Sequence, residues 1–284
     1  MNLEEQVTDR FFSLRSLRSL RLIIGMKVLK KKSSVVLIIP ARWGSTRFPG
    51  KLLHSLAGRP LLQHVWERCQ KTRAIERIII ATDDRRIKEV ATAFGAEVVM
   101  TSVKHQSGTD RIAEAAQKLE KKGTSHFSHV INVQGDEPLI DARLIDRLAK
   151  TMLQDHEVEM ITAATPLSDE VHRNDPNVVK VVLDQQKNAL YFSRSLIPYH
   201  RDMNDHKSAV HPLLHLGIYG FRKDILKKYV RYRPSPLERC EKLEQLRALE
   251  HGIKIRVLST SHRALGVDTP EDAKRIESHF RKTC

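Results

Sequence analysis

Residues 38–51 read IIPARWGSTRFPGK, a polar loop that follows directly on a short apolar run. The run, Val35–Ile39, is continuously apolar, which is typical of a strand buried on both faces of a parallel sheet. The loop nearly matches a phosphate-binding P-loop, but five residues rather than four separate Gly44 from Gly50, and Leu52 replaces the motif's hydroxyl. The stretch therefore predicts a buried strand followed by a loop that is not a Walker P-loop.

The same loop carries three cations, Arg42, Arg47 and Lys51. Cations and backbone N–H groups beyond a strand end suit a polyphosphate. The alternative is that the glycines and prolines only shape a turn and that the cations face solvent.

Apolar strands alternate with amphipathic helices outward from this loop. Strands are predicted at 35–39, 77–82, 97–100 and 129–133, and helices at 61–69, 85–94, from 110 and from 141. After about residue 160 strands prevail, at 161–165, 178–183, 190–192, 216–221 and 254–258, with helices at 237–251 and from 270. This order predicts an α/β fold with a mixed, mostly parallel sheet and helices on both faces, whose ligands lie beyond the carboxyl ends of strands.

Composition and charge narrow the class of protein. The 284 residues are 40% hydrophobic, enough for one large domain, and no apolar run approaches the roughly 20 residues of a membrane span. The N-terminus opens with acidic residues, and the cysteines (Cys69, Cys240 and Cys284) lack metal or disulfide spacing, so we expect a cytoplasmic protein. The net charge of +15 includes no basic run with interleaved aromatic residues, and we expect no nucleic-acid partner and no stable membrane insertion.

The predicted domain boundary lies at residues 33 and 34. Residues 1–33 form a basic extension, which we expect to be disordered or to precede a true start at Met26; a basic amphipathic helix over LRSLRSLRL is the alternative. Residues 34–284 are predicted to form one domain.

Two further loops carry carboxylates. Asp136 and Glu137 follow the strand at 129–133, where a buried carboxylate pair is costly unless it binds a cation or a partner. Asp136 is the better metal ligand, whereas Glu137 could bind metal, cap the next helix or face solvent. Near the other end of the sequence, Thr269 and Asp272 form a helix start that leaves Asp268 unexplained. Asp268 could converge with Asp136 to bind Mg²⁺ together with phosphate oxygens.

Nine segments in order resemble one family over about residues 35–280. They are IIPARWGSTRFPGK (38–51), IIIATDD (78–84), HQSGTDR (105–111), NVQGDEP (132–138), NVVKVVLD (177–184), ALYFSRSLIP (189–198), HLGIYGF (215–221), SPLERCEKLEQLR (235–247) and GVDTPED (266–272). The chain thereby resembles the 3-deoxy-manno-octulosonate cytidylyltransferases, the CMP-Kdo synthetases of lipopolysaccharide synthesis. Leu52, where the family often has proline, and Gly44, for a commoner alanine, are departures that change no charged group.

The resemblance implies a glycosyltransferase-A-like nucleotidyltransferase fold and the reaction of CTP with 3-deoxy-D-manno-octulosonate (Kdo) to give CMP-Kdo and pyrophosphate. It further implies Mg²⁺ as cofactor and a homodimer whose dimerisation and sugar-binding portion lies at about 160–250. Alternatives are a related 2-keto sugar acid as acceptor (8-amino-Kdo or sialic acid), or a non-catalytic nucleotide- or polyanion-binding protein.

Residue roles also follow from the resemblance. The implied catalytic residues are Arg42, Lys51, Asp136 and Asp268, of which Asp136 and Asp268 hold the metal. The implied nucleotide site comprises Ala41, Arg42, Ser45, Arg47, Lys51, Ser107, Gly108 and Arg111. The implied sugar site comprises Gln134, Arg194, His215, Tyr219, Glu244 and Gln245.

Overall fold

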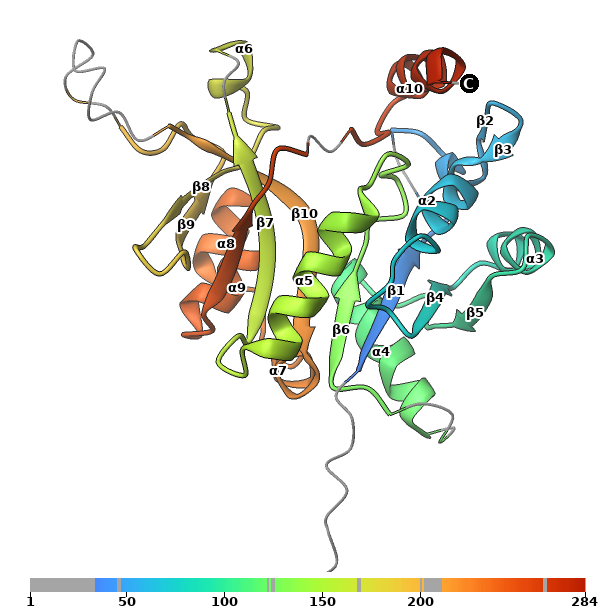
Figure 1. Ribbon diagram of the computed structural model, residues 1–284, viewed down its shortest axis with the longest axis horizontal. Helices are drawn as coiled ribbons and strands as arrows, with labels where there is room; N and C mark the ends of the chain where they lie inside the picture. Colours follow the sequence, from blue (N-terminus) through green and yellow to red (C-terminus); the bar gives the residue numbers. More distant parts are fainter. Residues whose placement is uncertain are drawn as a thin grey trace, which may run out of the picture. The chain divides into compact units, whose positions relative to one another are not determined.

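Strand β1 (Val35–Ala41) lies inside a nine-stranded sheet, as its apolar sequence predicts (Figure 1). The computed structural model describes residues 34–44, 47–121, 123, 126–167, 170–199, 201, 211–262 and 265–283. The predicted extension at 1–33 and the predicted site residue Ser45 lie outside the described residues.

The strands on one side of the sheet are all parallel. β1 pairs in parallel with β4 (Arg77–Thr82) and β6 (His129–Asn132), and β4 pairs with β5 (Glu97–Met100). Beyond β6, β10 (Leu213–Arg222) runs antiparallel between β6 and β7 (Met160–Pro166). The remaining strands are β11 (Ile255–Ser259), parallel to β7, and the antiparallel pair β8 (Lys180–Leu183) and β9 (Ala189–Ser193), which extends from β10.

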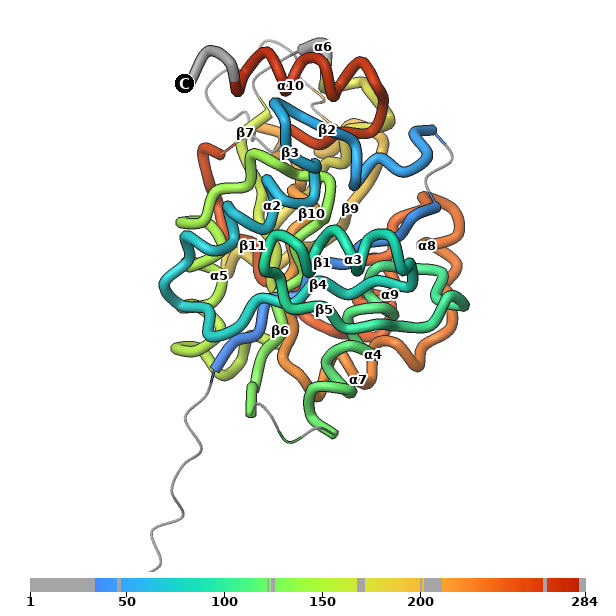
Figure 2. Tube along the Cα trace, turned by 90° about the vertical axis from the view of Figure 1, so that its right-hand side faces the viewer, coloured from blue at the N-terminus to red at the C-terminus, as the bar shows by residue number. Residues whose placement is uncertain are grey.

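Helices cover both faces of this sheet. Successive residues of a strand point to opposite faces, so the apolar strands contribute side chains to a hydrophobic core on each face. Leu37 and Ile39 pack with α2 (Leu61–Cys69), α3 (Arg85–Ala93), α5 (Ala142–Gln154) and α10 (Pro270–Thr283). Val36 and Ile38 pack with α4 (Gly108–Lys121), α7 (Lys223–Tyr229) and α9 (Gln245–Glu250). Figure 2 shows α2 and α5 on one side of the strands and α4, α7 and α9 on the other. The predicted mixed, mostly parallel α/β class is confirmed.

The single helix predicted over 237–251 is wrong. The structure has two helices there, α8 (Pro236–Glu241) and α9, because Lys242 adopts a left-handed conformation with φ 55° and ψ 43°. The break lets Arg247 turn back and donate to Glu238 at 2.7 Å. The prediction also missed several short elements: η1 (Lys51–Leu53), the hairpin β2 (Ser55–Leu56) and β3 (Arg59–Pro60), α6 (Glu170–Arg173) and α7.

A bulge interrupts β10 where it crosses β7. The pairing register shifts between Leu216 and Tyr219, leaving Gly217 and Ile218 as extra residues. The hydroxyl of Thr162 on β7 lies 3.1 Å from the Leu216 carbonyl oxygen and 2.8 Å from that of Ile218, so its single O–H donates within the bulge, where the ladder is interrupted. The bulge sets the positions of Gly217 and Tyr219 beside the candidate site.

None of the helices in the described ranges has the length and apolarity that a bilayer crossing requires.

Candidate active site

A cavity of about 460 Å³ opens beyond the carboxyl ends of β1 and β6. The structure brings most of the predicted site residues to its wall: Arg42, Arg47, Lys51, Ser107, Gly108, Arg111, Gln134, Asp136, Tyr219, Glu244 and Asp268. Its position agrees with the rule that α/β sheets bind ligands beyond their carboxyl strand ends.

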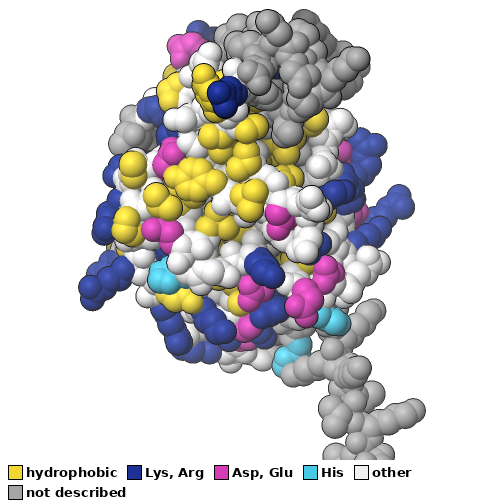
Figure 3. All heavy atoms as spheres, turned by 90° about the vertical axis from the view of Figure 1, so that its left-hand side faces the viewer, with side chains coloured by type: hydrophobic (Ala, Val, Ile, Leu, Met, Phe, Trp, Pro, Cys, Tyr) yellow, Lys and Arg dark blue, Asp and Glu magenta, His cyan; other side chains and the backbone are white. Residues whose placement is uncertain are grey.

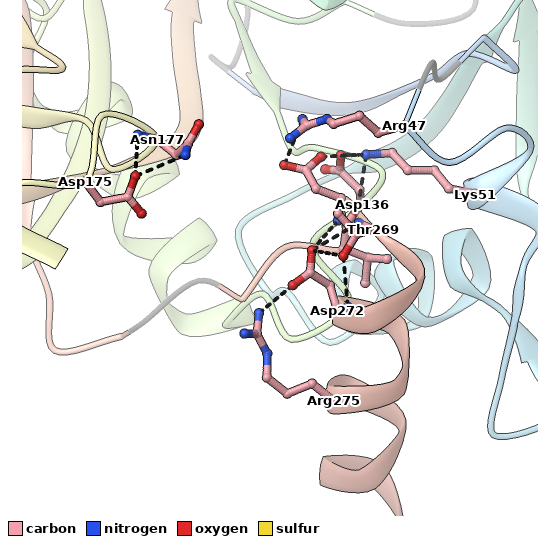
Figure 4. A network of polar contacts seen from close by, with 10 residues as sticks. Arg47, Lys51, Asp136, Asp175, Asn177, Thr269, Asp272 and Arg275 are labelled. Atoms are coloured by element: carbon pink, nitrogen blue, oxygen red, sulfur yellow. Dashed lines mark hydrogen bonds and ion pairs between the residues drawn. The ribbon is translucent and has the colours of Figure 1, made fainter. Parts of the chain in front are cut away.

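Lys51 is the centre of the charged part of this cavity (Figure 4). Its ammonium donates to Asp136 Oδ2 at 2.6 Å, to Asp268 Oδ1 at 3.1 Å and to the carbonyl oxygen of Val267 at 3.0 Å. Arg47 contacts the other oxygen of Asp268 at 3.1 Å. Asp136 and Asp268 lie 85 and 217 positions away from Lys51 in the sequence, and both contact the same nitrogen atom in the fold.

Asp268 is held in place by the start of α10. Asp272 accepts hydrogen bonds from the backbone N–H groups of Asp268 at 3.1 Å and Thr269 at 3.0 Å, while the Asp272 N–H donates to the Thr269 hydroxyl at 3.2 Å. This reciprocal cap is the one that the sequence predicts. It leaves the Asp268 side chain available to the cavity, where it is 50% exposed.

The paired carboxylates fit a magnesium ion. Mg²⁺ prefers oxygen ligands and is commonly bound by one or two carboxylates together with substrate phosphates. Asp136 and Asp268 supply two carboxylates that already converge on one cationic atom. In the part of the chain that the structure describes, no group of three or more His, Cys, Asp and Glu side chains could hold a metal ion. Substrate oxygens or water would therefore have to complete the coordination.

Of the roles that the sequence left open for Glu137, capping of helix α5 is wrong. The residue is half-buried, and the β-carbon of an alanine at Gly217 would lie 3.4 Å from Glu137 Oε1. Helix α5 is capped by Asp141, which accepts from the Arg143 N–H at 2.9 Å. Loss of solvent, and next the charge of Asp136, raises the pKa of Glu137 to about 8. The metal role of Glu137 stays a prediction.

The wall predicted to face the nucleotide base is the start of α4. Ser107 accepts from the Asp110 N–H at 3.1 Å and so caps the helix, and Gly108 packs so closely on Pro40 that an added β-carbon would lie 3.4 Å from the proline ring. Glu114 ties the preceding loop down by accepting from the Ser102 N–H at 2.8 Å. The loop is therefore fixed on both sides of the predicted base site.

Arg111 is more deeply buried than a ligand-binding arginine needs to be. Its side chain is 3% exposed and donates to Thr101 at 2.6 Å and to Asp83 at 2.8 Å. The guanidinium thus joins the α4 start to the ends of β4 and β5 at the cavity wall, and its contact with the nucleotide stays a prediction.

The predicted sugar-binding residues are not all brought together. Gln134, Tyr219 and Glu244 line the cavity, but Arg194, His215 and Gln245 do not. The Arg194 guanidinium donates to backbone carbonyl oxygens of Pro176 at 2.7 Å and Glu241 at 2.6 Å.

His215 lines a second, largely apolar cavity of about 450 Å³ that also contains Gly217 of the bulge. Loss of solvent lowers the pKa of His215 to about 3, so the imidazole is neutral at physiological pH. Gln245 is only 7% exposed, and Ala41, predicted for the nucleotide site, is a fully buried end of β1.

Sequence reasoning missed Asn132 and Thr109, which both line the main cavity. Asn132 is the polar last residue of the otherwise largely apolar β6, and this break in the pattern is a signal that could have identified it. Thr109 sits inside the recognised HQSGTDR segment and donates to Glu244 at 3.2 Å.

Trp43 packs against the loop that is predicted to bind phosphate. The guanidinium of Arg86 lies 3.4 Å above the Trp43 ring, and the ring packs against Gly50, which has φ +69°. A β-carbon at Gly50 would lie 2.9 Å from the ring, closer than such atoms approach in proteins. Gly50 therefore lets the chain turn into η1, which begins at Lys51, while the indole lies against the glycine.

We expect Gly50→Ala to lower the free energy of unfolding by roughly 2–4 kcal/mol, because the variant combines left-handed backbone strain with overpacking against Trp43. Urea unfolding of the wild type and the variant measures this difference in the free energy of unfolding. The matched control is Gly58→Ala, which has φ +81° but nothing within 4 Å of the added carbon, so only strain of about 1–2 kcal/mol applies. Equal losses in the two variants would show that the indole contact does not constrain the loop.

Comparison with known proteins places the chain in a family. The cytidylyltransferase family model matches residues 36–255. The 3-deoxy-manno-octulosonate cytidylyltransferase of Syntrophotalea carbinolica is 46% identical over 253 residues, which cover 87% of this chain and 99% of that protein. The mitochondrial 3-deoxy-manno-octulosonate cytidylyltransferase of Arabidopsis thaliana is 45% identical, over 89% of this chain and 85% of that protein.

Solved structures agree with the sequence relatives. A CMP:2-keto-3-deoxy-manno-octonic acid synthetase complexed with CTP is similar with a TM-score of 0.82 and 37% identity, covering 89% of this chain and 100% of that one. A cytidylyltransferase from Leptospira borgpetersenii, with a TM-score of 0.59 and 18% identity over 88% of this chain and 87% of that one, shares the fold. The chain therefore belongs to the cytidylyltransferase family, among the 3-deoxy-manno-octulosonate cytidylyltransferases.

Proposed function

We propose that the protein transfers the cytidylyl group of CTP to Kdo, giving CMP-Kdo and pyrophosphate for lipopolysaccharide synthesis. The observation that carries this proposal is the cluster of Lys51, Asp136 and Asp268 at the wall of the main cavity, in a chain 46% identical to a 3-deoxy-manno-octulosonate cytidylyltransferase. The CTP complex of the structural neighbour supports CTP as the nucleotide.

The chemistry requires positioning and charge neutralisation rather than a covalent intermediate. The anomeric hydroxyl of the acceptor attacks the α-phosphorus of CTP and releases its proton to water, while the bond from the α-phosphorus to the bridging oxygen breaks and pyrophosphate leaves with that electron pair. Arg42, Arg47 and Lys51 bind the triphosphate and stabilise the charge that builds on the leaving group. Arg42 suits this role because it is exposed at the cavity wall and, within the described ranges, forms no ion pair.

Asp136 and Asp268 would hold Mg²⁺. When bound, the ion would supply Lewis-acid polarisation of the phosphoryl oxygens and neutralise their charge. The carboxylates themselves fix where that charge lies relative to Lys51, which contacts both of them.

Gln134, Tyr219 and Glu244 are proposed to contact the acceptor sugar, because these three of the implied sugar-site residues line the cavity. The Gln134 amide donates to the Gly217 carbonyl oxygen at 3.3 Å, which joins this wall to the bulge. The sugar contacts implied for Arg194, His215 and Gln245 stay predictions from the family resemblance, as does the cytoplasmic location.

We also propose a homodimer formed through about residues 160–250. Figure 3 shows apolar side chains gathered on the face of the molecule that carries β8 and β9. Leu190 on β9 is 61% exposed and Tyr199, just after it, is 87% exposed. An exposed apolar surface of this kind is typical of an interaction site.

The test is a pyrophosphate-release assay with the purified protein, CTP, Kdo and Mg²⁺. We expect pyrophosphate in amounts equal to the CMP-Kdo formed, with no release when Kdo is omitted. Absence of release, with and without a coupling pyrophosphatase, would refute the proposal.

The same assay identifies the acceptor and the nucleotide. Sialic acid and 8-amino-Kdo are tested in place of Kdo, and UTP and ATP in place of CTP. We expect the highest kcat/KM for CTP with Kdo, and a higher value for another acid would reassign the acceptor while keeping the cytidylyl transfer.

A further inference from the structure

Asn132 is a buried polar residue whose side-chain oxygen has no hydrogen-bond partner among the residues that the structure describes. It ends β6, is 2% exposed and lines the main cavity. Its side-chain oxygen is fully buried and, among the described residues, receives no hydrogen bond. Leaving such a group unpaired costs free energy comparable to a lost hydrogen bond, so native proteins rarely do so without a reason.

Glu244 presents a second unpaired acceptor to the same cavity. Its Oε2 accepts from the Thr109 hydroxyl at 3.2 Å, whereas Oε1 is fully buried and unpaired within the described ranges. Burial raises the pKa of this carboxyl despite the opposing charge of Arg247. Glu244 precedes α9 and Asn132 ends β6, so the two acceptors come from separate elements and constitute independent observations.

The chemistry of this wall differs from that of the charged cluster around Lys51. Asn132 is paired in register with Tyr219 on β10, and both residues line the main cavity together with Glu244. Two buried acceptors select neutral O–H or N–H donors, and a carboxylate there disfavours phosphate. Adjacent hydroxyls of a sugar provide two such donors.

We propose that Asn132 is a specificity-determining residue that, with Glu244, binds two neighbouring hydroxyls of a substrate sugar. This proposal rests on the proposed cytidylyl transfer and deepens it, because both the ribose of the nucleotide and the acceptor sugar carry such hydroxyls. The unpaired oxygen of Asn132 lowers the stability of the unliganded protein. A hydrogen bond from a bound hydroxyl removes this cost and so adds to the binding affinity.

The test compares Asn132→Leu, which keeps the volume, with Asn132→Ala, which leaves space and cannot block the substrate. We expect both variants to raise the KM of one substrate by roughly 10- to 100-fold, the effect of losing a buried hydrogen bond. The Tm of the unliganded Asn132→Leu variant should be unchanged or higher, because a buried unpaired amide is replaced by an apolar group.

Asn188→Ala is the matched control. Asn188 is 9% exposed, but it donates to Asp184 at 3.1 Å and accepts from Arg256 at 3.0 Å, away from the cavity. We expect this control to lower Tm by roughly 2–4 °C and to leave both KM values unchanged. A raised KM without a loss of Tm in the Asn132 variants, beside a lower Tm with unchanged KM values in Asn188→Ala, would distinguish a binding residue from a structural one.

Further measurements identify the sugar. If Asn132→Ala raises the KM of CTP, then 2′-deoxy- or 3′-deoxy-CTP should remove the difference between wild type and variant, and the ribose is the ligand. If it raises the KM of Kdo alone, the acceptor is the ligand. Unchanged KM values for both substrates, or a fall in Tm without a change in KM, would overturn the proposal. So would a variant whose main change is in discrimination between CTP and UTP, because an amino group would then be the ligand.

Failure of this inference is distinguishable from failure of the proposed function. Wild-type protein that releases no pyrophosphate would refute the function, yet the rise in Tm that CTP or Kdo causes can still be compared between wild type and Asn132→Ala. An equal substrate-induced rise in both proteins would refute the role of Asn132 without any activity measurement.

Discussion

Replacing Lys51 with alanine is expected to lower turnover by roughly 10²- to 10³-fold, the usual cost of removing one preorganised charge stabiliser. Lys51 connects the two carboxylates of the site, because its ammonium nitrogen lies 2.6 Å from an oxygen of Asp136 and 3.1 Å from an oxygen of Asp268. Its side chain is only 13% exposed, so solvent cannot replace the lost charge efficiently. Single-turnover measurement of pyrophosphate release at saturating CTP and Kdo separates this effect on chemistry from an effect on product release.

Two companion variants make the Lys51 result interpretable. Lys51→Arg keeps the charge but not its compact geometry, and we expect it to recover only part of the rate. Lys254→Ala removes an equal charge in a surface depression that contains Arg256, and its turnover should be normal. Turnover by Lys51→Ala within a few-fold of wild type would remove Lys51 from the catalytic residues.

Asp136→Asn is expected to abolish most magnesium-dependent turnover, with a loss of roughly 10²-fold or more. The variant keeps the shape of the side chain but removes the charge that a hard cation prefers. Asp268→Asn should have a smaller effect, because Asp268 is 50% exposed and shares its charge with Arg47, whereas Asp136 is 28% exposed. Turnover measured across a range of Mg²⁺ concentrations tests both variants.

The control for the carboxylates is Asp155→Asn, which loses a 3.4 Å contact with Arg256 outside the main cavity and should keep the wild-type Mg²⁺ dependence. A shift to higher Mg²⁺ requirement in Asp136→Asn and Asp268→Asn would support the proposed ligands. Near-normal rates at low Mg²⁺ in either variant would exclude that residue as a ligand.

The parallel part of the fold could be predicted because its signals are local. The continuous apolar run at Val35–Ile39 and the helical spacing after Pro60 each determine their own element. The placement of β10 between β6 and β7 has no such local signal. It depends on which strand edges remain unpaired after the other strands have paired. The break at Lys242 was also unpredictable, because a left-handed lysine is stable only where tertiary contacts such as Arg247 with Glu238 compensate it.

The charged part of the site could be predicted for a physical reason. Asp136 follows a buried strand, where an unpaired carboxylate is costly. Asp268 precedes a helix whose cap explains Thr269 and Asp272 but not Asp268. Both carboxylates were therefore expected to bind a cation. The sugar wall could not be predicted in the same way. Asn132 looks like an ordinary strand end until its missing partner is seen, and Arg194 looks like a carboxylate ligand until its guanidinium is found on backbone carbonyl groups.

The order of strands in the sheet has a consequence for biosynthesis. β10 is made after both β6 and β7, yet it is the strand that joins them. On the ribosome, the edge of β6 therefore stays unpaired while residues 133–212 emerge, and an open strand edge is a template for aggregation. The nascent chain can pair this edge of β6 only when residues 213–222 have left the exit tunnel, and β7 gains its second neighbour later still, when residues 255–259 of β11 emerge.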